Sequence, residues 1–240
     1  MTFFKSLATV VVLAAVALPA LAQEAVIRKN LGERIPQLQK IDEVSKSPMP
    51  GLYEIRINGT DIFYTDAEGN YLIQGSLIDT RARRNLTEER VEKLSAIAFD
   101  DLPLKDAFTI VRGNGKRKLA VFEDPNCGYC KRFERDLQKV DNITVYMFLY
   151  PILGPDSVDK SKRIWCAKEP AKAWLDLMVR DRSLSAADGP GCDTAAITRN
   201  VELGRKHKIS GTPTLIFADG QRVPGAISAV QVEKFLADAK

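Results

Sequence analysis

The chain has 240 residues, of which 45% are hydrophobic and 28% charged, and its formal net charge is +4. This is ordinary globular composition, long enough for one or two domains with cores of their own, and it excludes a repeat or low-complexity protein. The mild positive charge gives no reason to expect nucleic acid as a partner. The only dense basic run, Arg81–Arg84, is expected to be a solvated surface segment.

Residues 1–22 predict a secretory signal peptide. Lys5 precedes an almost wholly apolar run from Leu7 to Leu21, and Ala20-Leu21-Ala22 fits the small-x-small cleavage rule. The apolar run of about 15 residues is short for a bilayer span, which argues against the alternative of a retained membrane anchor. We therefore expect cleavage after Ala22 and an exported, soluble mature protein.

Residues 23–83 predict a small domain of one helix and an antiparallel sheet. The helix is expected over 24–39, because apolar residues recur there near helical spacing, and the Pro- and Gly-rich segment 47–51 then breaks the chain. The expected strands are Leu52–Ile57, Ile62–Thr65 and Tyr71–Asp79. Such a unit is too small to bury a good core alone, so we expect it to pair with a second copy through a sheet edge.

Residues 84–105 predict a linker helix, capped by Thr87 and running to about Ala98. Residues 106–240 then predict a second domain that mixes strands and helices. Its expected strands are Phe108–Arg112, Leu119–Phe122, Thr144–Leu149, Thr214–Phe217 and Gln221–Val223. Its expected later helices lie around Lys160–Lys168, Ala171–Arg180, Thr194–Lys206 and Ser228–Ala239.

The most informative motif is Cys127-Gly128-Tyr129-Cys130, which stands between a predicted strand and a predicted helix. At the start of a helix, unsatisfied backbone N–H groups and the positive end of the helix dipole favour a thiolate on the first cysteine. Lys131 and Arg132 add positive charge nearby. The second sulfur follows within one turn, close enough to form a reducible disulfide with the first. The motif therefore predicts thiol–disulfide exchange.

Two other interpretations of this motif are weaker. A structural zinc site needs a second ligand pair at short spacing, and Cys166, Cys192 and the single His207 do not supply one, so we expect no metal and no other cofactor. A purely structural Cys127–Cys130 bond would close almost no loop and add little stability.

Export also determines how the other two cysteines are interpreted. In an oxidising compartment spare cysteines normally pair, which leaves Cys166 bonded to Cys192. That bond would tie the helix at 161–168 to the loop at 183–191. The alternative, a second active pair, is disfavoured by the wide spacing and by the lack of a helix N-terminus.

A second chemical motif is Ser210-Gly211-Thr212-Pro213, in which the proline begins a strand. A cis Thr212–Pro213 bond would turn the Thr212 backbone outward beside the sulfurs, as a docking edge for an extended peptide. The alternative is an ordinary trans proline in a turn.

With these residues in view, the mature chain resembles the periplasmic protein-disulfide isomerases of the DsbC type. The stretches that carry the resemblance are 71–75 (Tyr-Leu-Ile-Gln-Gly), 122–130, 164–168 (Ile-Trp-Cys-Ala-Lys) and 210–213. The resemblance implies an α+β N-terminal dimerisation domain of cystatin-like fold, joined by a linker helix to an α/β thioredoxin-fold domain with a helical insertion. It also implies a homodimer with two catalytic domains facing a cleft, a Cys166–Cys192 bridge and recharging by a DsbD-type membrane reductase.

One position departs from thioredoxin itself. Thioredoxins carry a buried Asp six residues before the first active cysteine, and here that position is Val121. Glu123 could replace this carboxylate only if its side chain turned inward, and we expect it to be solvated instead.

The predicted function is the rearrangement of wrong disulfides in misfolded exported proteins, together with chaperone activity. Cys127 is the expected nucleophile and Cys130 the resolving thiol, while Tyr129, Thr212 and Pro213 are expected to bind substrate. The alternatives are a DsbG-like reductase or chaperone, a monomeric DsbA-type oxidant, and a chaperone without redox chemistry. The extra N-terminal unit argues against the simple oxidant.

Overall fold

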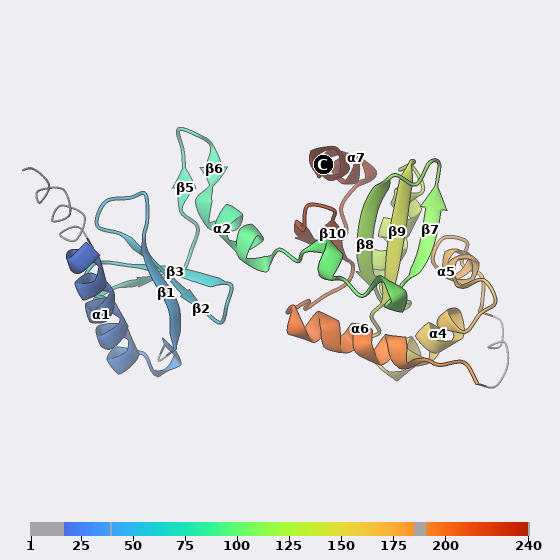
Figure 1. Cartoon of the computed structure of the whole chain (residues 1–240), viewed down its shortest axis with the longest axis horizontal. Helices are drawn as coiled ribbons and strands as arrows, with labels where there is room; N and C mark the ends of the chain where they lie inside the picture. Colours follow the sequence, from blue (N-terminus) through green and yellow to red (C-terminus); the bar gives the residue numbers. More distant parts are fainter. Residues whose placement is uncertain (1–16, 39, 185–190, 240) are drawn as a thin grey trace, which may run out of the picture. The chain divides into compact units, whose positions relative to one another are not determined.

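The computed structural model describes residues 17–38, 40–184 and 191–239. The chain divides into two compact units, Met1–Leu94 and Ser95–Lys240 (Figure 1). Most of the predicted signal peptide lies outside the described residues, and its last residues from Ala17 onward form the start of a helix. In the described ranges, no helix is long and apolar enough to cross a membrane.

The N-terminal unit is an antiparallel sheet packed against helix α1 (Ala17–Arg34). Its strands, in sheet order, are β1 (Ile41–Lys46), β2 (Tyr53–Ile57), β3 (Asp61–Thr65) and β4 (Leu72–Ile73). A short ribbon of β5 (Ile78–Asp79) and β6 (Arg84–Asn85), a 3-10 turn at Pro36–Leu38 and helix α2 (Leu86–Ser95) complete it. Ile27 and Leu31, one helical turn apart, pack against Ile55 and Ile57, which alternate on β2.

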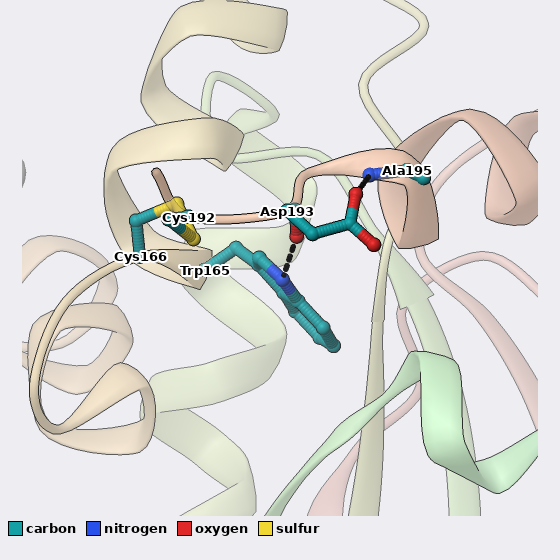
Figure 2. The surroundings of a disulfide bond; sticks show 5 residues. All are labelled: Trp165, Cys166, Cys192, Asp193 and Ala195. Carbon is teal, nitrogen blue, oxygen red and sulfur yellow. Dashed lines mark hydrogen bonds between the residues drawn. A yellow bond between two sulfur atoms is a disulfide. The ribbon is translucent and has the colours of Figure 1, made fainter. Parts of the chain in front are cut away.

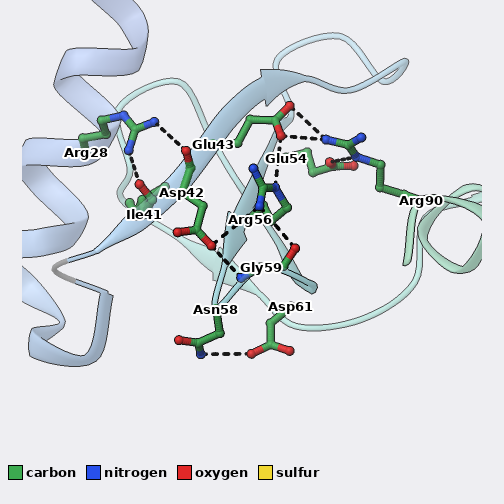
Figure 3. A network of polar contacts seen from close by, with 10 residues as sticks. All are labelled: Arg28, Ile41, Asp42, Glu43, Glu54, Arg56, Asn58, Gly59, Asp61 and Arg90. Carbon is green, nitrogen blue, oxygen red and sulfur yellow. Dashed lines mark hydrogen bonds and ion pairs between the residues drawn. The ribbon is translucent and has the colours of Figure 1, made fainter. Parts of the chain in front are cut away.

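Strand β1 was missed by the sequence analysis because its residues are largely polar. Ion pairs join it to neighbouring elements (Figure 3). Arg56 of β2 lies 3.0 Å from Glu43 and 3.7 Å from Asp42, both on β1. Arg90 of α2 contacts Glu43 at 2.8 Å and Glu54 of β2 at 2.9 Å. A strand whose acidic side chains are paired in this way does not need the apolar alternation that sequence patterns detect.

Three other predictions for this unit are wrong in detail. The helix expected over 24–39 ends at Arg34, because the residue before Pro36 is disfavoured in helical conformation. The single strand expected over Tyr71–Asp79 is two short strands, β4 paired with β3 and β5 paired with β6. The expected cap Thr87 lies inside α2, where its hydroxyl accepts from the Leu77 amide at 2.8 Å, and α2 ends at Ser95.

The second unit is built on a five-stranded sheet in the order β11-β10-β8-β9-β7, in which only β8 and β9 run parallel. Its strands are β7 (Phe108–Arg112), β8 (Arg117–Glu123), β9 (Ile143–Leu149), β10 (Thr214–Phe217) and β11 (Arg222–Pro224). Its helices are α3 (Gly128–Leu137), α4 (Pro155–Trp165), α5 (Pro170–Met178), α6 (Ala195–Lys206) and α7 (Ala229–Asp238). Short 3-10 turns at Phe99–Asp101 and Leu104–Asp106 precede β7. These bounds agree with the expected order of elements.

The central strand β8 serves two cores, one on each face of the sheet. Leu119 and Val121 belong to the cluster that includes α3, α5 and α7, whereas Ala120 and Phe122 belong to the cluster on the other face, against which α6 packs. Side chains of a strand alternate between faces, so the next residue, Glu123, points to the same side as Val121. The strand therefore directs its last side chain toward α3.

Candidate active site

The turn between β8 and α3 is held by the buried carboxylate of Asp124. It accepts hydrogen bonds from the amides of Asn126 (2.8 Å) and Leu153 (2.9 Å) and from the hydroxyl of Ser157 (2.7 Å). The Cys127 amide in turn donates to the Asp124 carbonyl at 3.0 Å. The first active-site cysteine thus starts its helix from a rigid turn.

Cys127 is the N-cap residue of α3, and its sulfur accepts a hydrogen bond from the Cys130 backbone N–H at 3.3 Å. The interaction with the Cys130 thiol lowers the pKa of Cys127 most, Thr212 and the first helical amides lower it further, and burial opposes them. The pKa falls from 9.0 to about 5. Cys127 is therefore a thiolate at neutral pH.

Cys130 has the opposite character, although it lies only three residues further on. Its side chain is fully buried, and burial is the main reason why its pKa is raised, followed by its hydrogen bond to Cys127 and the charge of Glu123. Both cysteines are free thiols in this structure. The pair therefore combines one ionised sulfur with one protonated sulfur.

The Ser-Gly-Thr-Pro motif lies against the first sulfur. The Thr212–Pro213 peptide bond is cis, as predicted, and the Thr212 carbonyl oxygen lies 3.3 Å from the Cys127 sulfur. Pro213 is buried and Thr212 half-buried. Two segments 85 residues apart in the sequence are thus brought together at the reactive atom.

Tyr129, between the two cysteines, projects into solvent and is 63% exposed. The Arg132 guanidinium lies over its ring, 4.7 Å from the centroid. A surface groove of about 570 Å³ begins at Tyr129 and Arg132 and runs along α3 to Ile227. An apolar ring and a groove therefore adjoin the thiolate.

The expectation that Glu123 is solvated is wrong. Its side chain has no exposed surface, because strand alternation directs it between β8 and α3. Sequence reasoning also missed Glu134, which is equally buried and lies four residues after Cys130, on the same face of α3. That helical spacing was the available signal. Asp124, the residue that holds the turn, has no comparable pattern around it.

Cys166 and Cys192 form a disulfide, as predicted (Figure 2). Cys166 directly follows α4, so the predicted helix over 161–168 ends earlier, at Trp165. The Trp165 indole N–H donates to the Asp193 carbonyl at 2.9 Å, beside the bond. Part of the loop that the bond closes, residues 185–190, lies outside the described residues.

Comparison with known proteins agrees with this arrangement. Residues 18–88 match the disulfide bond isomerase protein N-terminal domain, and residues 104–240 match the thioredoxin-like domain. The expectation of these two domains is thereby confirmed.

Individual relatives are named as disulfide interchange proteins. The probable thiol:disulfide interchange protein DsbC of Bordetella bronchiseptica is 49% identical over 193 residues, which cover 80% of this chain and 67% of that protein. DsbC of Escherichia coli K12 is 29% identical over 204 residues, covering 82% and 81%. The solved disulfide interchange protein from Neisseria gonorrhoeae has a TM-score of 0.51 and 37% identity, covering 57% of this chain and 98% of its own. The chain therefore belongs to the DsbC family of thiol:disulfide interchange proteins and is a thiol–disulfide oxidoreductase of the isomerase type.

Proposed function

We propose that Cys127 is the attacking thiol and Cys130 the resolving thiol of this enzyme, acting on wrong disulfides in misfolded exported proteins. The observation that carries the proposal is the contrast between the two sulfurs. The pKa of Cys127 is about 5, while burial raises that of Cys130, so only Cys127 is nucleophilic at neutral pH.

Isomerisation then takes two steps. The Cys127 thiolate attacks one sulfur of a substrate disulfide, forms a mixed disulfide and releases the other substrate sulfur as a thiolate. A different substrate thiolate attacks the mixed disulfide, forms a new pairing and restores Cys127. If no substrate thiol arrives, Cys130 attacks Cys127 instead and the substrate leaves reduced.

We assign substrate docking to Thr212, Pro213 and Tyr129. The Thr212 carbonyl lies beside the sulfur at the entry of β10, where an extended peptide can pair with backbone groups. The exposed ring of Tyr129 supplies apolar surface next to it.

The test is the refolding of a scrambled multi-disulfide protein by the full mature chain. We expect Cys127→Ser to abolish the rearrangement. Cys130→Ser should keep isomerisation by substrate thiols but accumulate mixed disulfides. Rearrangement by Cys127→Ser at the wild-type rate would overturn the assignment, and oxidation of reduced substrate without rearrangement would favour a DsbA-type oxidant.

The same chemistry bears on a proposal about the compartment and the reductant. We propose a periplasmic protein cleaved after Ala22, whose Cys127–Cys130 pair is kept reduced by a DsbD-type membrane reductase. The Cys166–Cys192 disulfide supports an oxidising compartment. N-terminal sequencing and thiol trapping in cells, with and without the reductase, test both parts.

Chaperone activity is a second proposal, favoured by exposed apolar side chains near the site. Tyr129 is joined by Ile152 and Leu153, which follow β9 and are 37% and 56% exposed. A Cys127→Ser/Cys130→Ser variant should still suppress aggregation of an unfolded protein. Loss of suppression in that variant, with the fold intact, would contradict the proposal.

A further inference from the structure

Two buried carboxyl groups lie behind the reactive sulfurs and have no part in the exchange steps above. Glu123 ends β8 and points toward α3, and Glu134 lies on the buried face of α3, one turn beyond Cys130. Both side chains are completely buried.

The hydrogen bonding of this pair is incomplete. One oxygen of Glu134 accepts from the Trp174 indole N–H at 3.0 Å. Its other oxygen, both oxygens of Glu123 and the three guanidinium nitrogens of Arg112 are buried without a hydrogen-bond partner among the described residues. Buried polar atoms in this state are rare and costly, and a carboxyl group reduces the cost by holding a proton.

The charges around the pair indicate which carboxyl holds that proton. Glu134 and Cys127 act on Glu123, and Glu123 acts in turn on Cys130. Asp124 follows Glu123 in the chain, and Arg112 of β7 acts on Glu134.

Burial raises the pKa of Glu123 well above its usual value, and the charges of Glu134 and Cys127 raise it further. Burial also raises the pKa of Glu134, but the Trp174 N–H and the charge of Arg112 oppose this effect. The surroundings therefore favour the proton on Glu123 more strongly than on Glu134.

We propose that Glu123 and Glu134 form a proton store for Cys130, in which Glu123 exchanges the proton and Glu134 positions it. The proposal rests on the proposed roles of Cys127 and Cys130. It assigns a function to a buried acid that does not stand at the position of the buried Asp of thioredoxin. At the position of that Asp, this chain has Val121.

The cycle begins with the reduced enzyme, in which Cys127 is a thiolate and both Cys130 and Glu123 are protonated. When Cys127 forms the mixed disulfide its negative charge disappears, and with it one of the causes that hold the proton on Glu123. Glu123 then releases its proton toward solvent and becomes a carboxylate next to the Cys130 thiol.

The resolution step transfers one proton and exchanges one disulfide bond. The Cys130 thiol passes its proton to the Glu123 carboxylate while its sulfur attacks Cys127. The Cys127–Cys130 bond forms, the bond from Cys127 to the substrate breaks, and the substrate leaves as a thiolate that takes a proton from water. The two cysteines are oxidised and the substrate disulfide is reduced, so no further oxidant is needed.

The central experiment follows both steps separately in the intact protein. A reduced enzyme mixed with a peptide disulfide in a stopped-flow instrument releases one peptide thiol when Cys127 attacks and the second when Cys130 resolves. We expect Glu123→Gln to slow the second release by roughly tenfold or more at neutral pH and to flatten its pH profile. The first release should change by less than about twofold, because protonated Glu and Gln are both neutral.

Matched variants separate a proton function from a structural one. Glu123→Asp should restore part of the second step, since it keeps a titrating carboxyl. Glu134→Gln should shift the pH profile of that step without removing it. Glu233→Gln, which changes a half-exposed carboxylate paired with Arg117, should leave both steps at the wild-type rate.

A direct readout comes from infrared difference spectra of the Cys130→Ser protein, in which the mixed disulfide persists. The band of a protonated carboxylic acid should be present in the reduced form, lost in the mixed disulfide and missing throughout when Glu123→Gln is added. An unchanged band, or a Glu123→Gln protein with wild-type resolution at every pH, overturns the proton store. Absence of the first thiol release in wild type would instead overturn the roles of Cys127 and Cys130.

Discussion

At the scale of single residues, the site depends on a difference in charge between two neighbouring sulfurs. The Cys127 thiolate is stabilised by hydrogen bonds from Cys130 and the start of α3, whereas Cys130 is surrounded by apolar core and by buried acid. The helix dipole acts on both, but burial decides which sulfur keeps its proton.

The stability of the reduced form should depend on pH through Cys127. Its folded pKa of about 5 lies below the ordinary 9.0, so between these values the unfolded chain binds more protons than the folded one. The contribution of Cys127 to the free energy of unfolding is complete above the ordinary pKa of 9.0. It is lost as the pH falls through the folded pKa of about 5.

Urea unfolding of the reduced and the oxidised protein over this range measures the effect. Their stability difference should favour the reduced form increasingly as the pH rises. A constant difference would show that Cys127 is not perturbed. The pH dependence of the reduced Cys127→Ser protein should lack the contribution that Cys127 makes in the reduced wild type.

Asp124 is expected to matter more for stability than its place in a turn suggests. Asp124→Ala would leave the amides of Asn126 and Leu153 and the hydroxyl of Ser157 without their acceptor. We expect a loss of about 2–4 kcal/mol in the free energy of unfolding. Slower alkylation of Cys127 at mildly acidic pH should accompany it. Denaturant unfolding tests the stability loss, and alkylation rates test the effect on Cys127. If Asp124→Ala left the free energy of unfolding unchanged, water would have replaced the carboxylate.

At the scale of elements, the Cys166–Cys192 bond joins the end of α4 to the segment before α6, across 26 residues of sequence. Removing it with Cys166→Ser/Cys192→Ser should cost about 3 kcal/mol in the chain-entropy model. Thermal or urea unfolding gives the cost.

Thiol exchange by Cys127 should persist in this double variant, because the hydrogen bonds to the Cys127 sulfur come from Cys130 and Thr212 and not from the bonded pair. Mild reductant followed by mass mapping of the wild-type protein provides the comparison. The bond should stay closed when Cys127–Cys130 opens, and simultaneous opening would contradict a structural role.

At the scale of the whole molecule, we propose that residues 23–83 form the contact of a homodimer. The unit has a small core, and its apolar side chains Tyr71, Ile73 and Ile78 are 72%, 48% and 56% exposed along the sheet edge and the following ribbon. Such edges are normally covered, and a second copy across a two-fold axis covers both at once.

A charge on β4 should therefore break the dimer. Ile73→Glu is expected to give a monomer by light scattering that still exchanges small disulfides but rearranges scrambled proteins poorly. Val230→Glu, at a 79% exposed apolar residue of α7, is the matched control and should remain dimeric. A wild-type monomer at micromolar concentration would contradict the proposal.

The motif chemistry and the order of elements could be predicted from the sequence, because both depend on local patterns. Cys127 through Cys130 between a strand and a helix, Thr212-Pro213 at a strand start, and the apolar run Leu119–Phe122 are all readable within a few positions. The pairing of Cys166 with Cys192 followed from cysteine number and expected export.

Strand β1, the split of the predicted strand over Tyr71–Asp79 and the burial of Glu123 could not be predicted in this way, because they depend on what packs against each residue. The acidic side chain of Glu43 on strand β1 is paired with Arg56 and Arg90. Residues 74–77 do not form the expected strand, because no strand in the described part of the chain pairs with them. Glu123 looked like a solvated turn residue until alternation along β8 and packing by α3 placed it in the core. Burial is a property of the assembled layers, and it is burial that turns this acid into a candidate proton store.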